Sequence, residues 1–303
     1  MIAVGYVASR GTNSEKILRK FEVQMPDTNR TQKAAFIMSA EQSGSTWLSY
    51  VLGSYVDCAH LGEYFRPFLR PGHTACRLCE AKGKPQCEYL AGIENIPKED
   101  AHAFAFQRTG ARILVDCSKR LDWLELAAAS SKFESIALHL IKDPRGWFAS
   151  QKRRSRMTAK HGCAAWVKRN REIQNRLVQL GVPRFTTFYD EIILDPEQHM
   201  THVCDFLGIA FDPNAFRYWE VEHHGLGGNG AALNNLVRAE QYTVKTGDDE
   251  YYFDRLKKVF HDQRWSSELD ADEIAIIEQD KDVNEFLASC DRSFSDFDRL
   301  LQV

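Results

Sequence analysis

The sequence predicts an α/β fold, in which a parallel β-sheet is covered by helices on both faces. Short apolar runs with the length of strands alternate along the chain with longer runs of helical periodicity. Strands joined through helices in this way form parallel sheets with two covered faces. The chain has 303 residues, of which 44% are hydrophobic, so it can bury a full core.

The first strand and the first helix are joined by a loop of small residues. An apolar run at 34–38 leads into a turn at 39–46, and an apolar helical pattern follows from Trp47. A helix N-terminus offers unpaired backbone N–H groups and a positive dipole end, which bind phosphate or sulfate. Gly44 would let the backbone approach such an anion, so the fold is expected to be P-loop-like. Hydroxyl donors come from Ser43, Ser45 and Thr46. The alternative is an ordinary turn whose Ser and Thr side chains cap the helix.

The later elements follow from apolar periodicity and from the residues that begin or end helices. Strands are predicted at 111–117, 135–142 and 184–189, and helices at 121–127, from Pro144, at 163–180 and at 196–207. Pro144 fits the first turn of its helix, while Gly181 and Gly208 fit the ends of theirs. Ligands of parallel sheets bind at the carboxyl ends of the strands, where the small-residue loop would lie.

Four stretches depart from this alternation, and all are assigned to one domain, 1–303. Residues 1–33 have weak periodicity and form an N-terminal extension, whereas 70–97 are rich in Gly, Pro and Cys and form an irregular, Cys-containing insertion. Residues 223–230 are too glycine-rich for regular structure and are expected to form a mobile flap. Residues 248–303 form an acidic, helical C-terminal region.

Charge is distributed unevenly along the chain. Residues 142–176 hold eleven Lys and Arg against two Asp and Glu, while residues 248–303 hold seven against sixteen. A basic segment suits an anionic ligand, and a solvated helix face is the alternative. Nucleic acid is not an expected partner, because the whole chain has a net charge of −3 and shows no basic surface interleaved with aromatic residues.

The sequence indicates a cytoplasmic protein that does not enter a membrane. No stretch approaches the roughly 18 uninterrupted apolar residues of a membrane span. The start of the chain has no basic segment followed by an apolar run, as a secretory signal would. The eight cysteines are therefore expected to be reduced thiols or metal ligands rather than disulfides.

The loop lacks the signature of kinases that use ATP and magnesium, Gly-x-x-x-x-Gly-Lys-Ser/Thr. Gly44 stands alone there, and no Lys follows it. A second anchor for anions lies at 140–150, where Lys142 leaves the end of a strand and Ser150 follows eight residues later in the next helix. These two groups can grip one further phosphate. A P-loop kinase remains the alternative enzyme class.

These segments resemble the sulfotransferases that use 3′-phosphoadenosine 5′-phosphosulfate (PAPS) and release 3′,5′-ADP (PAP). The first family motif, Lys/Arg-Ser-Gly-Ser/Thr-Thr-Trp-Leu, is matched at 42–48. The resemblance implies a 5′-phosphosulfate site at Gln42, Ser43, Gly44, Ser45, Thr46 and Trp47. The second motif, Arg-Asp-Pro-Arg followed by Ser, is similar to 142–150. It implies that Lys142, Arg145 and Ser150 bind the 3′-phosphate.

Further segments extend the resemblance over about residues 34–270 and to the bacterial and carbohydrate-type branches. Residues 116–119 are similar to the element Asp-Ser-Ser-Lys, and Phe206-Leu-Gly208 to a late family segment. The string Gly-Glu-Tyr-Phe at 62–65 resembles the segment whose Glu is the acceptor base in some bacterial members. Gly227, Gly228 and Asn229 resemble a loop that folds over the donor.

Two residues depart from the family pattern. Lys142 replaces an Arg and keeps its charge, whereas Gln42 replaces the Lys or Arg that the family places against the bridging oxygen of the donor. Sulfuryl transfer moves negative charge onto the leaving phosphate, and a cation there is worth on the order of 3 kcal/mol by analogy with oxyanion-hole donors. Lys119, or Arg66, is expected to supply this charge. A non-catalytic nucleotide-binding protein is the alternative that Gln42 leaves open.

The acceptor, a hydroxyl or an amine of a small molecule or carbohydrate, requires a general base. Glu63 is the first candidate, because an aromatic setting would raise its pKa toward the working range. His60 is the second candidate, and His223 and His224 beside the glycines can also approach an acceptor. The alternatives are a salt-bridging or capping role for Glu63 and a packed histidine at position 60.

Three cysteines in the insertion form half of a zinc-ribbon pattern. Cys76 and Cys79 are separated by two residues, and Cys87 follows. The fourth ligand is not evident nearby in the sequence; its candidates are His73, Cys58 and His60. A structural zinc ion is therefore one expectation, and reduced thiols with at most one disulfide are the other.

Overall fold

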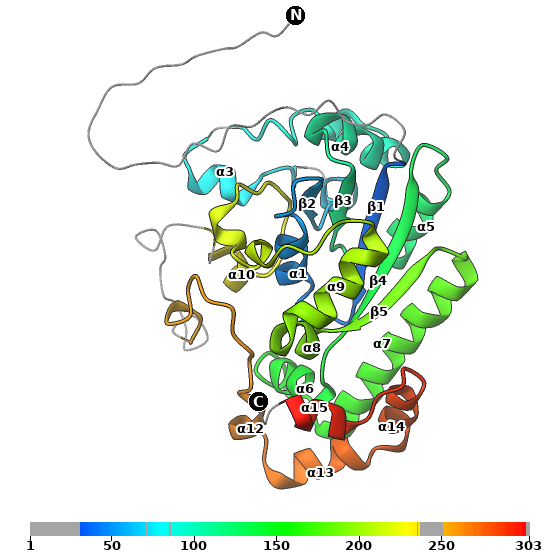
Figure 1. The fold of residues 1–303 in the computed structure, drawn as a ribbon, viewed down its shortest axis with the longest axis vertical. Coiled ribbons are helices and arrows are strands. Elements are labelled where there is room, and N and C mark those ends of the chain that lie inside the picture. The colour runs from blue at the N-terminus through cyan, green and yellow to red at the C-terminus, as the bar shows by residue number, and fades with distance from the viewer. Residues whose placement is uncertain (1–30, 71, 85, 235, 237–250, 301–303) are drawn as a thin grey trace, which may run out of the picture. The chain divides into compact units, whose positions relative to one another are not determined.

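Five parallel strands form the sheet in the described part of the computed structural model (Figure 1). The structure describes all residues except 1–30, 71, 85, 235, 237–250 and 301–303. The strand order is β2-β3-β1-β4-β5, and every neighbouring pair is parallel. The strands are β1 (Lys33–Ser39), β2 (Cys58–Gly62), β3 (Ile113–Asp116), β4 (Glu134–Ile141) and β5 (Arg184–Phe188). The predicted fold class is confirmed.

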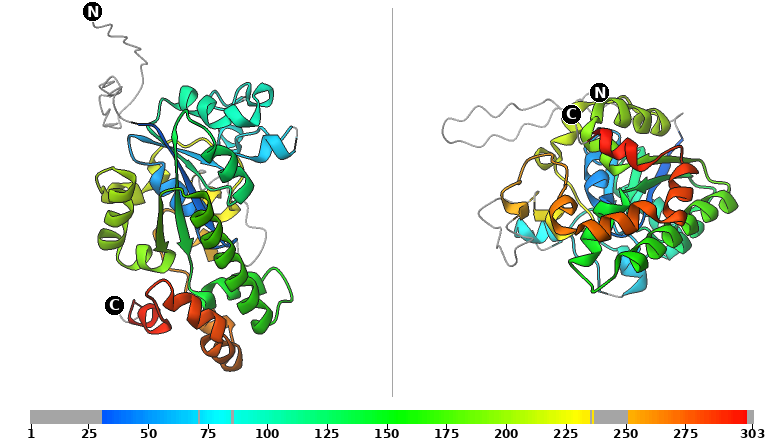
Figure 2. Two further views of the ribbon diagram at one scale, coloured as in Figure 1. Left: turned by 90° about the vertical axis from the view of Figure 1, so that its right-hand side faces the viewer. Right: turned by 90° about the horizontal axis from the view of Figure 1, so that it is seen from below.

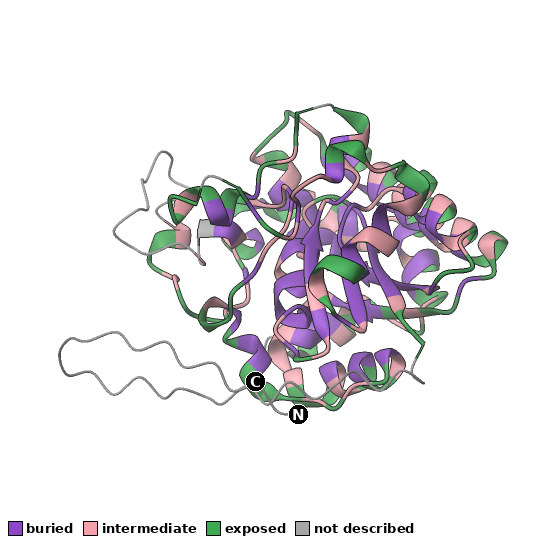
Figure 3. Cartoon of the chain, turned by 90° about the horizontal axis from the view of Figure 1, so that it is seen from above, coloured by how far each residue is buried: buried purple, intermediate pink, exposed green. Residues whose placement is uncertain are grey.

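Helices cover both faces of this sheet. Helix α1 (Ser45–Leu52) packs on β1, β2 and β3, and α9 (Pro196–Leu207) packs on β5. Helices α5 (Leu121–Ala128) and α7 (Ala159–Leu180) pack on β1 and β4, and Figure 2 shows α9 and α7 on opposite sides of the sheet. Strands β1 and β4 are consequently buried on both faces (Figure 3). This explains why β1 and β4 read as continuous apolar runs rather than as alternating ones.

The predicted helix boundaries have identifiable local causes. Helix α6 (Pro144–Lys152) begins with its proline, and the Asp143 side chain accepts a hydrogen bond from the Arg145 backbone N–H. Helix α7 begins four residues before the predicted start because Thr158 caps it. Gly181 and Gly208 end α7 and α9 in the left-handed conformation, as predicted.

Several elements are not predicted by the sequence pattern, among them β2, α4 (Ala101–Thr109) and α8 (Tyr189–Leu194). Strand β2 is short and lies at the edge of the sheet, and His60 and Gly62 interrupt its apolar pattern. The insertion at 70–97 is largely irregular, as expected, but contains α3 (Arg77–Ala81) and η1 (Ile93–Asn95). The short elements α2 (Arg66–Leu69) and η2 (Lys98–Asp100) flank it.

The C-terminal region is helical, as predicted. Its helices are α12 (Trp265–Glu268), α13 (Ala271–Gln279), α14 (Lys281–Ala288) and α15 (Phe294–Leu300). Helices α13 and α14 pack on α7, and α12 packs on α6. The connection from α9 contains η3 (Pro213–Phe216), η4 (Tyr218–Glu220) and α10 (Gly230–Asn234). No helix in the described residues combines the length and the apolar character needed to cross a bilayer.

The expected N-terminal extension, residues 1–33, lies almost wholly outside the described residues, which begin at Thr31. Strand β1 begins at Lys33.

Candidate functional site

A cavity of about 590 Å³ opens where β1 and β4 end. Its size is typical of sites for small ligands and cofactors. Most predicted site residues line it: Gln42, Gly44, Ser45, Thr46, Trp47, Glu63, Lys119, Lys142, Ser150, Gly228 and Asn229. Four of them lie outside the lining: Ser43, His60, Arg145 and Gly227. The fold thus joins segments from distant parts of the chain around one space.

The loop between β1 and α1 leaves the first turn of α1 without a side-chain cap. Gly44 is the N-cap residue, and no side chain there accepts a hydrogen bond from the helix. Gly44 has φ +87°, and a Cβ at this position would lie 2.4 Å from the Tyr189 ring. Only glycine fits this backbone. The loop therefore differs from the ordinary side-chain-capped turn that the sequence left as an alternative, and its N–H groups suit an anion.

Lys142 is a buried cation in the cavity wall. It follows β4 directly, and its Nζ lies 5.3 Å from the centre of the Tyr189 ring. Burial lowers the pKa of Lys142, while the charges of Asp262 and Asp190 oppose this shift. An anionic ligand would favour the charged form of Lys142 further.

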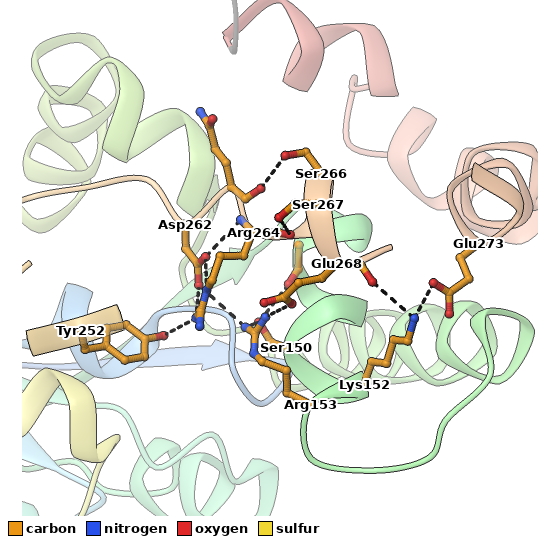
Figure 4. Close-up of polar contacts among 12 residues, drawn as sticks. Ser150, Lys152, Arg153, Tyr252, Asp262, Arg264, Ser266, Ser267, Glu268 and Glu273 are labelled. Carbon is orange, nitrogen blue, oxygen red and sulfur yellow. Dashed lines mark hydrogen bonds and ion pairs between the residues drawn. The ribbon is translucent and has the colours of Figure 1, made fainter. Parts of the chain in front are cut away.

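Ser150 lies beside a second cation, Arg153 (Figure 4). The Ser150 Oγ donates to the Gly146 carbonyl at 2.9 Å and accepts from Arg153 Nη2 at 3.2 Å. Arg153 also pairs with Asp262 at 3.8 Å. Burial alone would raise the pKa of Asp262, but the hydrogen bond from Arg264 and the charges of Lys142 and Arg153 lower it well below its usual range. Asp262 thus offsets the repulsion between two cations of the cavity.

Arg145 is a buried structural cation and lies outside the cavity, unlike what the family resemblance implies. Its guanidinium donates to Asp143 at 2.8 Å and lies over the Trp265 ring at 4.3 Å. It also donates to Glu278 and Asp298, each at 2.8 Å. Arg145 therefore connects α6 to α13 and α15 rather than facing the ligand space.

Glu63 is held by two cations, in agreement with the salt-bridging alternative that the sequence left open. Its Oε1 lies 3.3 Å from Lys119 Nζ, and its Oε2 accepts from Arg66 Nε at 2.7 Å. Lys119 also donates to the Cys117 carbonyl at 2.9 Å. Glu63 and Lys119 line the cavity, whereas Arg66 does not. The site consequently has a carboxylate and an ammonium group side by side.

The glycine-rich segment, expected to be a mobile flap, is paired to the edge of the sheet. The Leu226 N–H donates to the Leu61 carbonyl at 2.9 Å, and the Glu63 N–H donates to the Leu226 carbonyl at 2.6 Å. Asn229 then reaches the loop at the start of α1. Its N–H donates to Thr46 Oγ1 at 3.2 Å, and its side-chain amide donates to Gln42 Oε1 at 3.3 Å.

His60 and His223 are packed histidines. Both are buried and lie outside this cavity. His60 Nδ1 lies 2.6 Å from Ser49 Oγ, and His223 Nε2 lies 2.9 Å from the Tyr218 carbonyl. Burial lowers the pKa of both imidazoles, that of His223 to about 4. Neither is therefore placed to serve an acceptor in this cavity.

His224 belongs to a cluster with three cysteines. Its ring and the thiols of Cys76, Cys79 and Cys87 place four ligand atoms within 4.8 Å of one another. The fourth-ligand candidates His73, Cys58 and His60 are not in this group. The sequence pattern missed His224 as a partner because it lies 137 residues beyond Cys87.

Part of the cavity wall comes from residues that carried no recognised motif. These are Tyr252, Arg255, Leu256, Lys258, Phe260 and Asp262. Their only sequence signal is the mixture of aromatic and basic residues at 251–260. Arg153 and Arg154 also line the cavity. They belong to the basic segment for which the sequence allowed either an anionic ligand or a solvated helix face.

The chain shows similarity to a protein family and to several solved structures, among them two sulfotransferase domains. A family model described as the sulfotransferase family matches residues 34–213. No curated protein matches the chain. The sulfotransferase domain from the curacin biosynthetic pathway is 19% identical, with a TM-score of 0.43, over 82% of this chain and 98% of that one. The sulfotransferase domain from the Synechococcus PCC 7002 olefin synthase is 21% identical, with a TM-score of 0.42, over 84% and 96%.

Proposed function

Because the chain belongs to the sulfotransferase family, we propose that it transfers a sulfuryl group from PAPS to a hydroxyl or amine of a small-molecule or carbohydrate acceptor. The observation that carries the proposal is that one cavity is lined by the β1–α1 loop, by Lys142 and Ser150, and by Glu63. The first two are separate places for anions, and PAPS carries two anionic groups. The carboxylate is the base that an acceptor needs.

In this proposal, the start of α1 binds the 5′-phosphosulfate. Its first N–H groups have no side-chain cap, so they are free to bind an anion. Thr46 Oγ1 already accepts from the Asn229 N–H. Since a hydroxyl both donates and accepts, the Thr46 O–H can point into the cavity at a phosphosulfate oxygen.

The 3′-phosphate is assigned to Lys142 and Ser150, with Arg153 and Arg154 adding positive charge. All four line the cavity. Arg153 is held by Ser150 and Asp262, so its position is set before a ligand enters. A dianionic phosphate gains most from cations that are already fixed and partly desolvated.

Glu63 is proposed as the general base of an in-line transfer. The acceptor oxygen or nitrogen attacks sulfur and passes its proton to Glu63. On the opposite side of sulfur, the bond to the bridging oxygen breaks, and PAP leaves with that electron pair. Arg66 and Lys119 each hold one oxygen of the carboxylate, which fixes the direction in which Glu63 faces the acceptor.

Lys119 is proposed as the cation that compensates for Gln42. Gln42 uses its Oε1 to accept from Asn229, so its amide N–H₂ can donate to the donor but brings no charge. Lys119 lines the same cavity and carries the charge. A Lys119→Ala variant that keeps near-normal turnover with intact donor binding would exclude this role.

The donor is tested by ligand binding. We expect PAP and PAPS to raise the melting temperature, because either would bind the folded state. ATP with magnesium is the competing ligand of a P-loop kinase. Stabilisation by ATP with magnesium alone would overturn the PAPS proposal.

Catalysis is tested by Glu63→Gln, with Glu41→Gln as the matched control. Both carboxylates line the cavity, but only Glu63 is proposed as the base. Glu63→Gln should bind PAP within about twofold of the wild type and lose transfer by about 10²–10⁴-fold over a panel of alcohols, sugars and amines. Glu41→Gln should keep most of the activity. If the wild type binds PAPS but transfers to no acceptor in the panel, the non-catalytic alternative is favoured.

A further inference from the structure

The cluster of Cys76, Cys79, Cys87 and His224 lies outside the cavity and has no role in the proposed transfer. The three thiols are buried, and His224 is half-buried. All three cysteines are free thiols. The cluster therefore brings together three sulfur atoms and one imidazole from segments far apart in the chain.

We propose that these four residues bind one zinc ion, which fastens the glycine-rich segment at 225–229 to the insertion. Zinc in structural sites is tetrahedral and takes Cys₃His ligand sets, with Zn–S near 2.3 Å and Zn–N near 2.0–2.1 Å. Those bond lengths imply a separation of about 3.6 Å between a sulfur and a nitrogen ligand. His224 Nδ1 lies 3.3 Å from Cys79 Sγ and 3.4 Å from Cys87 Sγ. These two separations need to increase only slightly to accommodate the ion, and all four ligand atoms lie within 4.8 Å of one another.

The histidine has the outer contacts expected of a metal ligand. Its Nδ1 faces the thiols, while its Nε2 faces Glu222 Oε1 at 3.7 Å. A carboxylate near the outer nitrogen favours the tautomer that carries its proton there and leaves Nδ1 for the metal. The Tyr89 ring, 4.3 Å away, restricts the imidazole further.

The ligand types select zinc over other common ions. Three thiolates exclude magnesium and calcium, which prefer oxygen ligands. Iron–sulfur clusters of the common kinds need four cysteines or a paired-histidine arrangement. The spacing of two residues between Cys76 and Cys79 is the usual one for the first half of a zinc site.

Because of the position of His224, an ion bound there would also restrain the glycine-rich segment beside the cavity. Two residues later, Leu226 pairs with Leu61 and with the backbone of Glu63. Asn229 then contacts Thr46 and Gln42. An ion that holds His224 to the insertion thus holds the start of the segment that closes one side of the cavity.

Metal content of the full chain, purified without chelator from zinc-supplied cells, is the first test. We expect about one zinc per chain, and replacement by cobalt should give the intense visible absorption of tetrahedral cobalt thiolate. His224→Ala and Cys79→Ser should lower the zinc content at least about fivefold. The matched controls His73→Ala and Cys290→Ser, outside the cluster, should retain it. Wild-type protein without zinc, or with a disulfide among the three cysteines, overturns the proposal.

Hydrogen exchange tests the fastening role and does not depend on enzymatic activity. Removal of zinc from the wild-type protein should speed amide exchange at 224–229 by about tenfold or more, with β4 unchanged as an internal reference. Equal exchange with and without metal would overturn the fastening role. Because both readouts are independent of PAPS, their failure would leave the transferase proposal standing, and failure of that proposal would leave the zinc site standing.

Discussion

Replacement of Arg145 by Met separates a structural cation from a ligand-binding one. Arg145 is 2% exposed, and it donates to Asp143, which is 3% exposed. Burial raises the pKa of Asp143, and the charge and hydrogen bonds of Arg145 oppose that shift. Met has a similar length and no charge, so the variant leaves the Asp143 carboxylate buried without its cation.

The expected loss of stability follows from these burial values. Breaking a buried ion pair by removing one partner costs about 3–5 kcal/mol. The pairs with Glu278 and Asp298 contribute little, because those side chains are 37% and 47% exposed and exposed pairs are worth about 0–1 kcal/mol. We therefore expect Arg145→Met to lower the free energy of unfolding by about 4 kcal/mol, a large share of the typical 5–15 kcal/mol.

Urea unfolding and PAP titration together decide between the two roles. Arg145→Met should lose stability but bind PAP within about threefold of the wild type, at a temperature where both are folded. The control Lys142→Met should lower the affinity for PAP by about tenfold to a hundredfold, which corresponds to the free energy of a hydrogen bond to a charged group. Adding Asp143→Asn to Arg145→Met should recover part of the stability. The structural assignment would be refuted if the Arg145→Met protein had normal stability and its affinity for PAP fell more than tenfold.

Three further outcomes are expected. Gly44→Ala should lose PAP binding and about 2–4 kcal/mol of stability in urea unfolding. The reason is that Gly44 has a positive φ and that the added Cβ would meet the Tyr189 ring. Wild-type affinity for PAP would contradict this. Gln42→Lys should change the turnover rate less than about threefold if Lys119 already supplies the charge, and a tenfold rise would assign the missing charge to position 42. Burial lowers the pKa of His139 to about 4 from 6.5, so the unfolded state binds the proton more tightly. Stability should then fall by about 2 kcal/mol from pH 7 to pH 5 relative to His139→Gln; parallel pH profiles in urea unfolding would contradict this.

The elements that the sequence predicted are those whose signals are local. Pro144, Gly181 and Gly208 mark helix ends through their own backbone preferences. The strands β1 and β4 are largely apolar, as expected for strands covered on both faces. Strand β2 has no such signal, since its place at the edge of the sheet depends on pairing with β3 and on the bridge to Leu226.

The candidate site was predictable where one short segment supplies several groups at once. The loop at 42–47 is of this kind, and so are Lys142 and Ser150 with their fixed spacing. His224 joins cysteines far away in the chain, and Tyr252 to Asp262 enter the cavity from beyond α10. Such residues carry no pattern of their own, because tertiary packing alone decides what they meet.

Ion pairs between the basic segment and the acidic C-terminal region explain part of the uneven charge along the chain. Neither a ligand nor a solvated helix face, the two interpretations of the sequence, included this pairing. The basic segment faces the acidic C-terminal region within the described residues. Lys152 pairs with Glu273 at 2.6 Å, and Arg153 pairs with Glu268 (Figure 4). Arg171 pairs with Asp282 at 3.8 Å and Glu285 at 3.7 Å.

The pairs of Arg171 are exposed on both sides, so each is worth little free energy. The C-terminal helices are held mainly by apolar contacts, such as Trp166 against Phe286. The acidic side chains instead pair with cations of the basic segment, including Arg153, which also lines the cavity. At the cavity wall, positive charge of the basic segment is then carried mainly by Lys142 and Arg154, since Arg153 pairs with Glu268. We therefore expect the acidic C-terminal region to favour anion binding at the cavity over anion binding along the whole basic segment.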